Sequence, residues 1–297
     1  MNIKSILPFL AISLFLLAVV VRNRPVFNRT RSGKEPRSLS GEVLASERKV
    51  GKIAGALGWL SFAVYCSFEV SYYLNEDEYY DTSLALVFLA FSLLLAALML
   101  NIKPRASETG DDELLLTITK IALICAVLYF PFSEIANLGT LLIYLTTKIT
   151  ATVLNLFNVD VYVIYPSSIY TPNSSFHEIY KPIEIILACT AIQSMVLFTG
   201  LVFGVTAPIE RKVKAFFVSV PTIYLLNIAR NVFVTAAYFE EWFGSPLQSF
   251  YIAHGVIARI FAMLSLIVIA YAVFIILPES LDVIENFFRM LLRKRAR

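Results

Sequence analysis

Four side chains able to do chemistry interrupt three apolar stretches in the second half of the chain. Cys189 lies in the first stretch, Arg230 in the second, and His254 and Arg259 in the third. Charged or reactive groups inside membrane-length apolar segments are costly, and they usually serve a function. A thiolate is a nucleophile, an imidazole can carry its proton, and a guanidinium can hold a carboxylate or a developing oxyanion. Acyl transfer at a thiol is the chemistry that fits this set.

Helix geometry predicts that the four side chains lie at similar depths. At a rise of about 1.5 Å per residue, Cys189 lies roughly 9 Å and Arg230 roughly 12 Å from the predicted outer ends of their spans. His254 and Arg259 lie roughly 6 and 13 Å from the outer end of theirs. We therefore expect the four to meet at one level of the outer leaflet.

Polar neighbours surround these positions. Cys189 and Gln193 are four residues apart and share a helix face, and Asn227, Arg230 and Asn231 share another. Amide and hydroxyl groups there are suited to hydrogen-bonding an acyl group. We predict that five polar residues bind the substrate: Gln193, Ser194, Asn227, Asn231 and Glu184.

The sequence gives no reason to expect a metal or another cofactor. The other two cysteines, Cys66 and Cys125, lie in apolar segments without CxxC or histidine-paired spacing. With His177 and His254 as the only histidines, there is no HExxH motif. Nucleic acid is not suggested as a partner either.

The composition is that of a polytopic membrane protein. Of 297 residues, 58% are hydrophobic and 16% are charged, and the mean hydropathy is +0.72. The apolar runs are about 20 residues long, which is the length of a spanning helix, whereas barrel strands would be short and alternating. We therefore predict an all-α fold with about seven transmembrane helices. The predicted spans are 5–21, 53–74, 82–100, 114–130, 183–207, 213–238 and 250–277.

Charge placement sets the predicted topology. Basic residues crowd between Arg22 and Lys52, between Arg211 and Lys214, and after Arg289, so these segments are expected inside. Two predicted spans separate the last two clusters, so both clusters lie on the same side of the membrane. That side is the inside only if residues 134–158 lie along the outer interface or re-enter the membrane without crossing it. The N-terminus is then outside, and the active site faces the extracytoplasmic side.

Four regions follow from this topology: a four-helix N-terminal part at 1–131, an interfacial or re-entrant helix and outer loop at 132–182, a three-helix catalytic core at 183–277, and a basic cytoplasmic tail at 278–297. Residues 159–182 carry three prolines and alternating residues, so the outer loop is expected to hold a short strand pair. Asn173 begins a glycosylation sequon in that loop.

Spacing alone leaves two classes of protein open. In a thiol enzyme, Cys189 would be indispensable. In a transporter or channel, Arg230, Arg259 and His254 would pass an anion or protons, and the cysteine would be incidental. From spacing alone, the thiol enzyme is only slightly favoured.

Three sequence elements resemble the exosortase/archaeosortase family, and its archaeal branch in particular. They are the Ala-Cys-Thr-Ala-Ile-Gln-Ser element at 188–194, the Asn-Ile-Ala-Arg-Asn-Val-Phe element at 227–233, and the region of His254. The resemblance covers roughly residues 159–277, while the first four helices match only in hydropathy.

The resemblance implies a membrane-embedded cysteine transpeptidase. Its substrates would be secreted surface proteins with a C-terminal signal made of a short motif, a transmembrane helix and a basic cluster. In the archaeal branch the motif is Pro-Gly-Phe, and a membrane lipid is the expected acceptor. By position, Cys189 would be the nucleophile and Arg230 the essential arginine. His254 or Arg259 would complete the site, with His254 favoured on chemical grounds.

Overall fold

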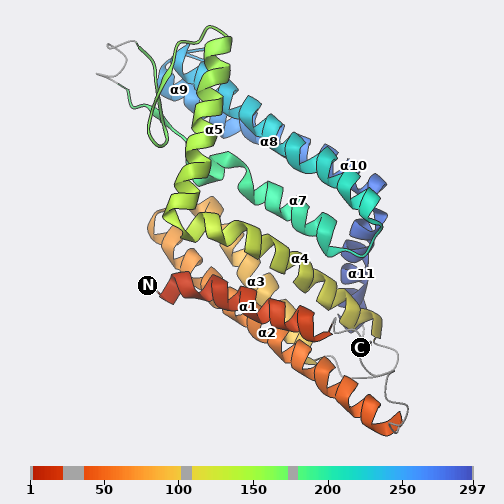
Figure 1. The fold of residues 1–297 in the computed structure, drawn as a ribbon. Helices are drawn as coiled ribbons and strands as arrows, with labels where there is room; N and C mark the ends of the chain where they lie inside the picture. The colour runs from red at the N-terminus through yellow and green to blue at the C-terminus, as the bar shows by residue number, and fades with distance from the viewer. Residues whose placement is uncertain (1–2, 23–36, 102–108, 173–179, 296–297) are drawn as a thin grey trace. The chain divides into compact units, whose positions relative to one another are not determined.

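The chain was analysed in a computed structural model that describes residues 3–22, 37–101, 109–172 and 180–295 (Figure 1). It divides into two compact units. Unit 1 comprises Met1–Val127 and Val283–Arg297, and unit 2 comprises Leu128–Asp282. Each unit has a hydrophobic core of its own, and each is considered separately below.

Unit 1 is a helical bundle built around α2 (Arg37–Asn75). This helix packs against α1 (Ile3–Arg22) and α3 (Tyr79–Asn101). The start of α4 (Thr109–Glu134) and the end of α11 (Pro278–Arg295) complete the core. Gly58 allows α1 to approach closely, because a Cβ atom there would lie 2.6 Å from the Phe15 ring.

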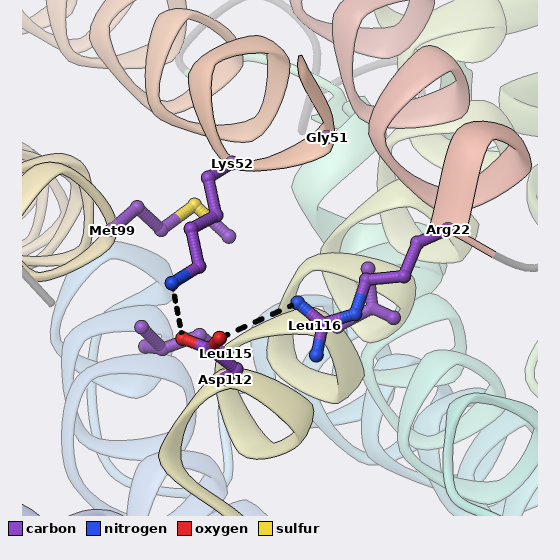
Figure 2. Close-up of a pocket in the computed structure, with 7 residues that line it drawn as sticks. All are labelled: Arg22, Gly51, Lys52, Met99, Asp112, Leu115 and Leu116. Carbon is purple, nitrogen blue, oxygen red and sulfur yellow. Dashed lines mark ion pairs between the residues drawn. The ribbon is translucent and has the colours of Figure 1, made fainter. Parts of the chain in front are cut away.

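Several charged residues of unit 1 form ion pairs, and Asp112 is the centre of one group (Figure 2). Asp112 forms an ion pair with Lys52, with 2.8 Å between Nζ and Oδ1. The other carboxylate oxygen of Asp112 lies 4.0 Å from the Arg22 guanidinium. Arg293 pairs with the neighbouring Asp111. Side chains from α1, α2, α4 and α11 therefore meet in one group of paired charges.

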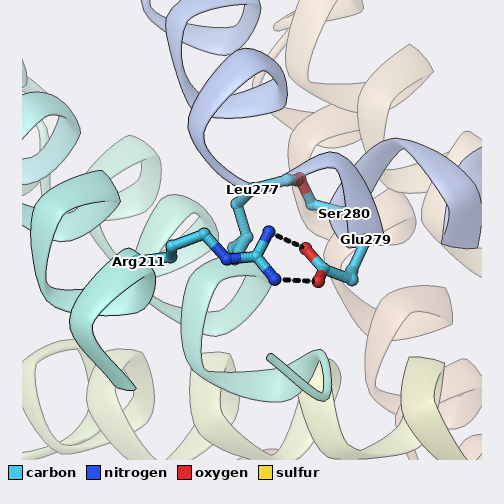
Figure 3. Close-up of polar contacts among 4 residues, drawn as sticks. All are labelled: Arg211, Leu277, Glu279 and Ser280. Carbon is cyan, nitrogen blue, oxygen red and sulfur yellow. Dashed lines mark hydrogen bonds and ion pairs between the residues drawn. The ribbon is translucent and has the colours of Figure 1, made fainter. Parts of the chain in front are cut away.

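Unit 2 is organised around α8 (Ile209–Phe239). Four helical segments contact α8: α5 (Ala136–Leu156), α7 (Ile192–Gly204), α9 (Pro246–Phe250) and α10 (Ala258–Ile276). A π-helical segment, η3 (Tyr251–Ile257), joins α9 to α10 without a break. Near the other end of α8, Arg211 donates two hydrogen bonds of 3.0 and 2.5 Å to Glu279 beside Ser280, which ties α8 to the start of α11 (Figure 3).

Between α5 and α7 the chain forms a small antiparallel sheet in the order β1-β2-β3. Strand β1 (Tyr162–Ile164) pairs with β2 (Ser168–Tyr170), and β3 (Ile183–Glu184) pairs with the other edge of β2. In Figure 1 this hairpin lies beside α5, which contacts both β1 and β2. Strands β1 and β3 are therefore the two edges of this sheet.

The predicted fold class is confirmed. Among the described residues, six helices are long and apolar enough to cross a membrane, and the expected strand pair is present. The predicted span at 183–207 differs: residues 183–191 are not α-helical, and α7 has only 13 residues, or about 20 Å at the usual rise. Hydropathy could not show this, because the same apolar residues form a strand that pairs with β2.

Three expectations remain predictions. Within the segment 134–158, residues Ala136–Leu156 form α5, and its position along or within the membrane stays a prediction. The four-region division and the side on which each loop lies also stay predictions. The sequon at Asn173 and the residue His177 lie outside the described part of the chain.

Candidate active site

Cys189 lies on a short turn, Ile186–Ala191, that we call the Cys189 turn. Residues Leu187–Thr190 form a single 3-10 segment, and the N–H of Cys189 donates to the carbonyl of Ile186 at 2.8 Å. The chain is extended just before it, because Ile183 pairs with Ile169 of β2 and the N–H of Ile185 donates to Ser167. The sheet therefore holds the entry to the turn and delays the start of α7.

Ala191 ends the turn in a left-handed conformation, with φ 58° and ψ 14°. For a residue with a Cβ atom, this conformation costs about 1–2 kcal/mol. Ala191 is also the N-cap of α7, so Cys189 lies two residues before the cap. The free N–H groups of a helix N-terminus favour negative charge, and a thiolate is one form of it.

Two asparagines of α8 hold the backbone of Cys189. The side-chain amides of Asn227 and Asn231 both donate to the Cys189 carbonyl oxygen, at 2.7 and 2.9 Å. Asn231 is buried at 4% exposure, so this contact is shielded from water. The sequence predicted the shared face of these residues but assigned them to the substrate. Their amide donors contact Cys189, and a role in substrate binding stays a prediction.

Arg230 is brought to the same place by its position on α8. It lies three residues after Asn227 and one before Asn231, on the helix face that holds the Cys189 turn. It is half-buried. Within the described ranges, no carboxylate lies within ion-pair distance of Arg230.

His254 lies in the π-helical segment before α10, a kind of segment that is frequent at functional sites. Its ring stacks on Phe250, with 5.0 Å between centroids and 5° between planes. Phe250 in turn packs against the hydrophobic cluster that Cys189 also contacts. The positive charges of Arg230 and Arg259 both act on His254, so α8 and α10 bring these three side chains near one another.

The remaining predicted residues lie around the turn. Gln193 and Ser194 are in the first turn of α7, where Gln193 is exposed and Ser194 is half-buried. Glu184 is exposed on β3, opposite Ser168, and is separated from Cys189 by the extended Ile185–Ile186 segment. The structure thus joins Cys189 to Asn227 and Asn231 directly, and leaves Glu184 at the sheet.

Two supports of the turn were missed from the sequence. The Thr190 hydroxyl donates to the Leu187 carbonyl at 2.7 Å, which closes the turn locally. The Tyr238 hydroxyl donates to the carbonyl of Lys181 at 2.8 Å and anchors the strand that leads into it. A Thr beside the cysteine was a visible signal for the first contact, whereas nothing in the sequence pointed to the second.

Chemically, the arrangement offers one thiol on a fixed backbone, and the helix that holds this backbone also carries Arg230. Among the described residues, no three metal-ligand side chains lie close enough together to hold an ion. A fixed thiol beside guanidinium groups is suited to forming an acyl intermediate whose oxyanion needs a positive neighbour.

Comparisons with known proteins give one family model and two relatives that match the chain. The model of the transmembrane exosortase family matches residues 9–271. Archaeosortase A of Natronomonas pharaonis is 30% identical over 198 residues, which cover 60% of this chain and 62% of that protein. Archaeosortase A of Haloferax volcanii is 33% identical over 122 residues, or 36% of this chain and 40% of that protein.

The matched region thus covers about three fifths and two fifths of the lengths of these two curated relatives. No solved structure matches the chain. Because the family model matches nearly the whole sequence, including the Cys189, Arg230 and His254 elements, this chain belongs to the transmembrane exosortase family.

Proposed function

We propose that this chain is a membrane-embedded cysteine transpeptidase that processes the C-terminal sorting signal of secreted surface proteins. One observation carries the proposal: the side-chain amides of Asn227 and Asn231 both donate hydrogen bonds to the carbonyl oxygen of Cys189. Arg230 lies between these two asparagines in the sequence of α8. A cysteine that only fills space does not need two amide donors on its backbone carbonyl. A nucleophile does need a fixed position, because small displacements of a reacting atom reduce the rate steeply.

In the proposed reaction, the substrate's scissile carbonyl lies beside the Cys189 turn. The Cys189 thiol loses its proton, and Sγ attacks the carbonyl carbon while Arg230 neutralises the oxyanion. The tetrahedral intermediate collapses, the C–N bond breaks, and the leaving amine takes the proton. The product is a thioester on Cys189 and a free C-terminal segment.

The thioester is then resolved by an acceptor. An amine attacks the thioester carbonyl, the C–S bond breaks, and the thiolate recovers the proton that the amine loses. We propose the head group of a membrane lipid as the acceptor, with water as the competing one. The names of the two relatives refer to archaeosortases, and the Pro-Gly-Phe motif and lipid attachment are proposed here by analogy with that branch.

His254 is the proposed proton carrier. An imidazole can take up and release a proton near neutral pH, and Arg230 and Arg259 lie close enough to His254 for their charges to act on it. Arg259 remains the other candidate for this role. A guanidinium cannot practically exchange a proton, so we assign Arg259 to substrate carboxylates or charge compensation.

The experiment that tests the function is processing of a surface protein with a Pro-Gly-Phe signal in cells carrying Cys189→Ala or Cys189→Ser. We expect both variants to accumulate the uncleaved precursor at wild-type enzyme levels. A transporter that uses Arg230, Arg259 and His254 would tolerate Cys189→Ser. Normal processing in the Cys189→Ala strain would refute the thiol mechanism.

A further inference from the structure

A groove of about 330 Å³ lies between α5 and β1, on the opposite side of the hairpin from β3. One stripe of α5 lines it, with Tyr144, Lys148, Thr152 and Asn155 spaced by three or four residues. Residues of β1 and the turn after it, including Val163 and Tyr165, form the other wall. We call this the tyrosine groove. All of it belongs to unit 2.

The wall formed by β1 is an edge of the sheet. Strand β1 pairs with β2 on one side only, and Asn155 occupies part of its other side. The Asn155 amide donates to the Val161 carbonyl at 3.0 Å, and its oxygen accepts the Val161 N–H at 2.9 Å. This is the pair of bonds that a neighbouring strand would make.

Strand geometry then determines where the next backbone groups face. The N–H and C=O groups of successive residues in a strand face opposite sides. Since Val161 directs both groups toward α5, Val163 directs both groups the same way, while Tyr162 and Ile164 face their partners Tyr170 and Ser168. Within the described residues, no hydrogen bond is made by the backbone of Val163 other than those β1 makes with β2.

The side chains around this open edge favour a particular ligand. The Tyr144 and Tyr165 rings lie 5.2 Å apart at one end of the groove. Aromatic walls bind proline and aromatic side chains, as in grooves that recognise extended peptides. Lys148 is exposed on the same wall and forms no ion pair with any described residue, so it adds a preference for an acidic side chain.

The tyrosine groove is adjacent to the candidate active site. Ala151 and Val161 line the groove and also belong to the hydrophobic cluster against which Cys189 packs. Helix α5 therefore contributes to both sites, because it contacts both β1 and the 3-10 segment that carries Cys189.

We propose that the tyrosine groove binds an extended peptide that adds as a fourth strand to the free edge of β1, pairing with the backbone of Val163. The peptide carries a proline or aromatic residue for Tyr144 and Tyr165 and an acidic residue for Lys148. Resting on the proposed function, this peptide is the segment of the sorting signal that precedes the transmembrane helix.

The test is peptide binding to the full-length Cys189→Ala protein in nanodiscs, so that cleavage cannot obscure affinity. The probe is a fluorescent twelve-residue peptide in which Pro-Gly-Phe is preceded by alternating valine and aspartate. Its binding is measured by fluorescence anisotropy. Single N-methyl groups are moved along its residues. In strand addition, only every second N–H faces β1, so N-methylation should alternate between about a tenfold loss of affinity and little effect.

Protein variants provide the matching evidence. Lys148→Gln should weaken binding about three- to fivefold at low salt and less at high salt. Lys181 is an exposed lysine two residues before β3, away from the groove. The Lys181→Gln variant is therefore the matched control and should bind normally. Tyr144→Leu keeps the volume of the wall and should weaken binding several-fold by removing the aromatic contact.

Each outcome decides one proposal. Uniform effects of N-methylation, or equal losses in Lys148→Gln and Lys181→Gln, would overturn strand addition, whether or not Cys189 processes substrates. Alternating effects together with normal processing in the Cys189→Ala strain would support the groove and refute the cysteine mechanism. Displacement of the probe by vesicles of phosphatidylglycerol, but not by unlabelled peptide, would assign the groove to lipid and overturn the peptide proposal.

Discussion

The two units treat charge inside an apolar environment in opposite ways. In unit 1, Lys52 and Arg22 both face Asp112, and their side chains are only 18% exposed. In unit 2, half-buried Arg230 has no carboxylate within ion-pair distance among the described residues. It also lies near His254, on which the charge of Arg259 acts as well. Unit 1 pairs these buried charges, whereas unit 2 leaves Arg230 without a carboxylate among the described residues and brings the charges of Arg230 and Arg259 to act on His254.

This difference separates structural charge from functional charge. Removing the partner of a buried cation destabilises the fold, because it leaves an uncompensated charge. A buried cation without a partner lowers the stability of the fold, and such a residue is retained when it binds an anion during function. The charges of unit 1 should therefore affect stability, and those of unit 2 should affect catalysis.

The largest expected effect is at Arg230. Arg230→Gln should lower kcat of signal processing by about 100- to 1000-fold, the range seen when an oxyanion donor is removed. Its melting temperature should stay equal or rise, because an unpaired charge is removed. Purified enzyme in detergent gives both values. A large fall in melting temperature would place Arg230 among the structural charges and break the contrast.

Asp112→Asn tests the opposite side of the contrast. It leaves Lys52 and Arg22 without their carboxylate, so unfolding should become easier by about 3 kcal/mol. Activity per folded molecule should remain at the wild-type level. The Glu285→Gln variant removes an exposed i,i+4 pair with Arg289 and serves as control, with an effect below about 0.5 kcal/mol.

A smaller effect is expected at the asparagine pair. Asn231→Leu removes one of two donors to the Cys189 carbonyl, so kcat should fall about tenfold while KM changes little. Ser219→Ala removes another buried hydrogen bond of α8, to Ala215, without touching the turn. It should lower stability to a similar extent and leave kcat intact. A rise in KM for Asn231→Leu alone would instead restore the predicted role in substrate binding.

The smallest expected effect is on pH dependence. Burial alone would raise the pKa of Glu279, but a backbone hydrogen bond and the Arg211 guanidinium lower it below its ordinary value. A depressed folded pKa stabilises above the unfolded value, and the gain is lost as the pH falls through the folded one. Glu279→Gln should therefore lower stability at pH 7 by about 1 kcal/mol or less, because the pair is partly exposed.

Thermal unfolding at several pH values measures this contribution. The gap between wild type and Glu279→Gln should close as the pH falls below 4.5, the ordinary value of the carboxyl group. A gap that stays constant well below pH 4.5 would show that the Arg211–Glu279 pair contributes nothing through its charge.

The membrane class and most helices were predictable because a long apolar run has few alternatives in a bilayer. Hydropathy predicted α10 well, since the run is uniform from Phe250 onward. It misjudged the start of α2, placed at Ile53 rather than Arg37, because the first turns of that helix are polar. Length and hydropathy report burial in lipid and say little about where a polar helix begins.

The local structure at Cys189 was beyond sequence reasoning for a different reason. Residues 183–191 are as apolar as a span, but Ile183 pairs with Ile169, fourteen positions earlier. That pairing depends on a sheet whose strands are only two or three residues long. The shared face of Asn227 and Asn231 was predictable from helix periodicity. Their acceptor was not, since a free carbonyl at Cys189 exists only because that residue is not in an α-helix.

The left-handed Ala191 implies a compromise between heat tolerance and turnover. Glycine adopts this conformation without a Cβ penalty, so Ala191→Gly should raise the melting temperature or leave it unchanged. It would also free the residue that follows the Cys189 turn to sample other conformations. A chain selected only for robustness would carry glycine here, and the alanine is consistent with selection for a rigid nucleophile at some expense of stability.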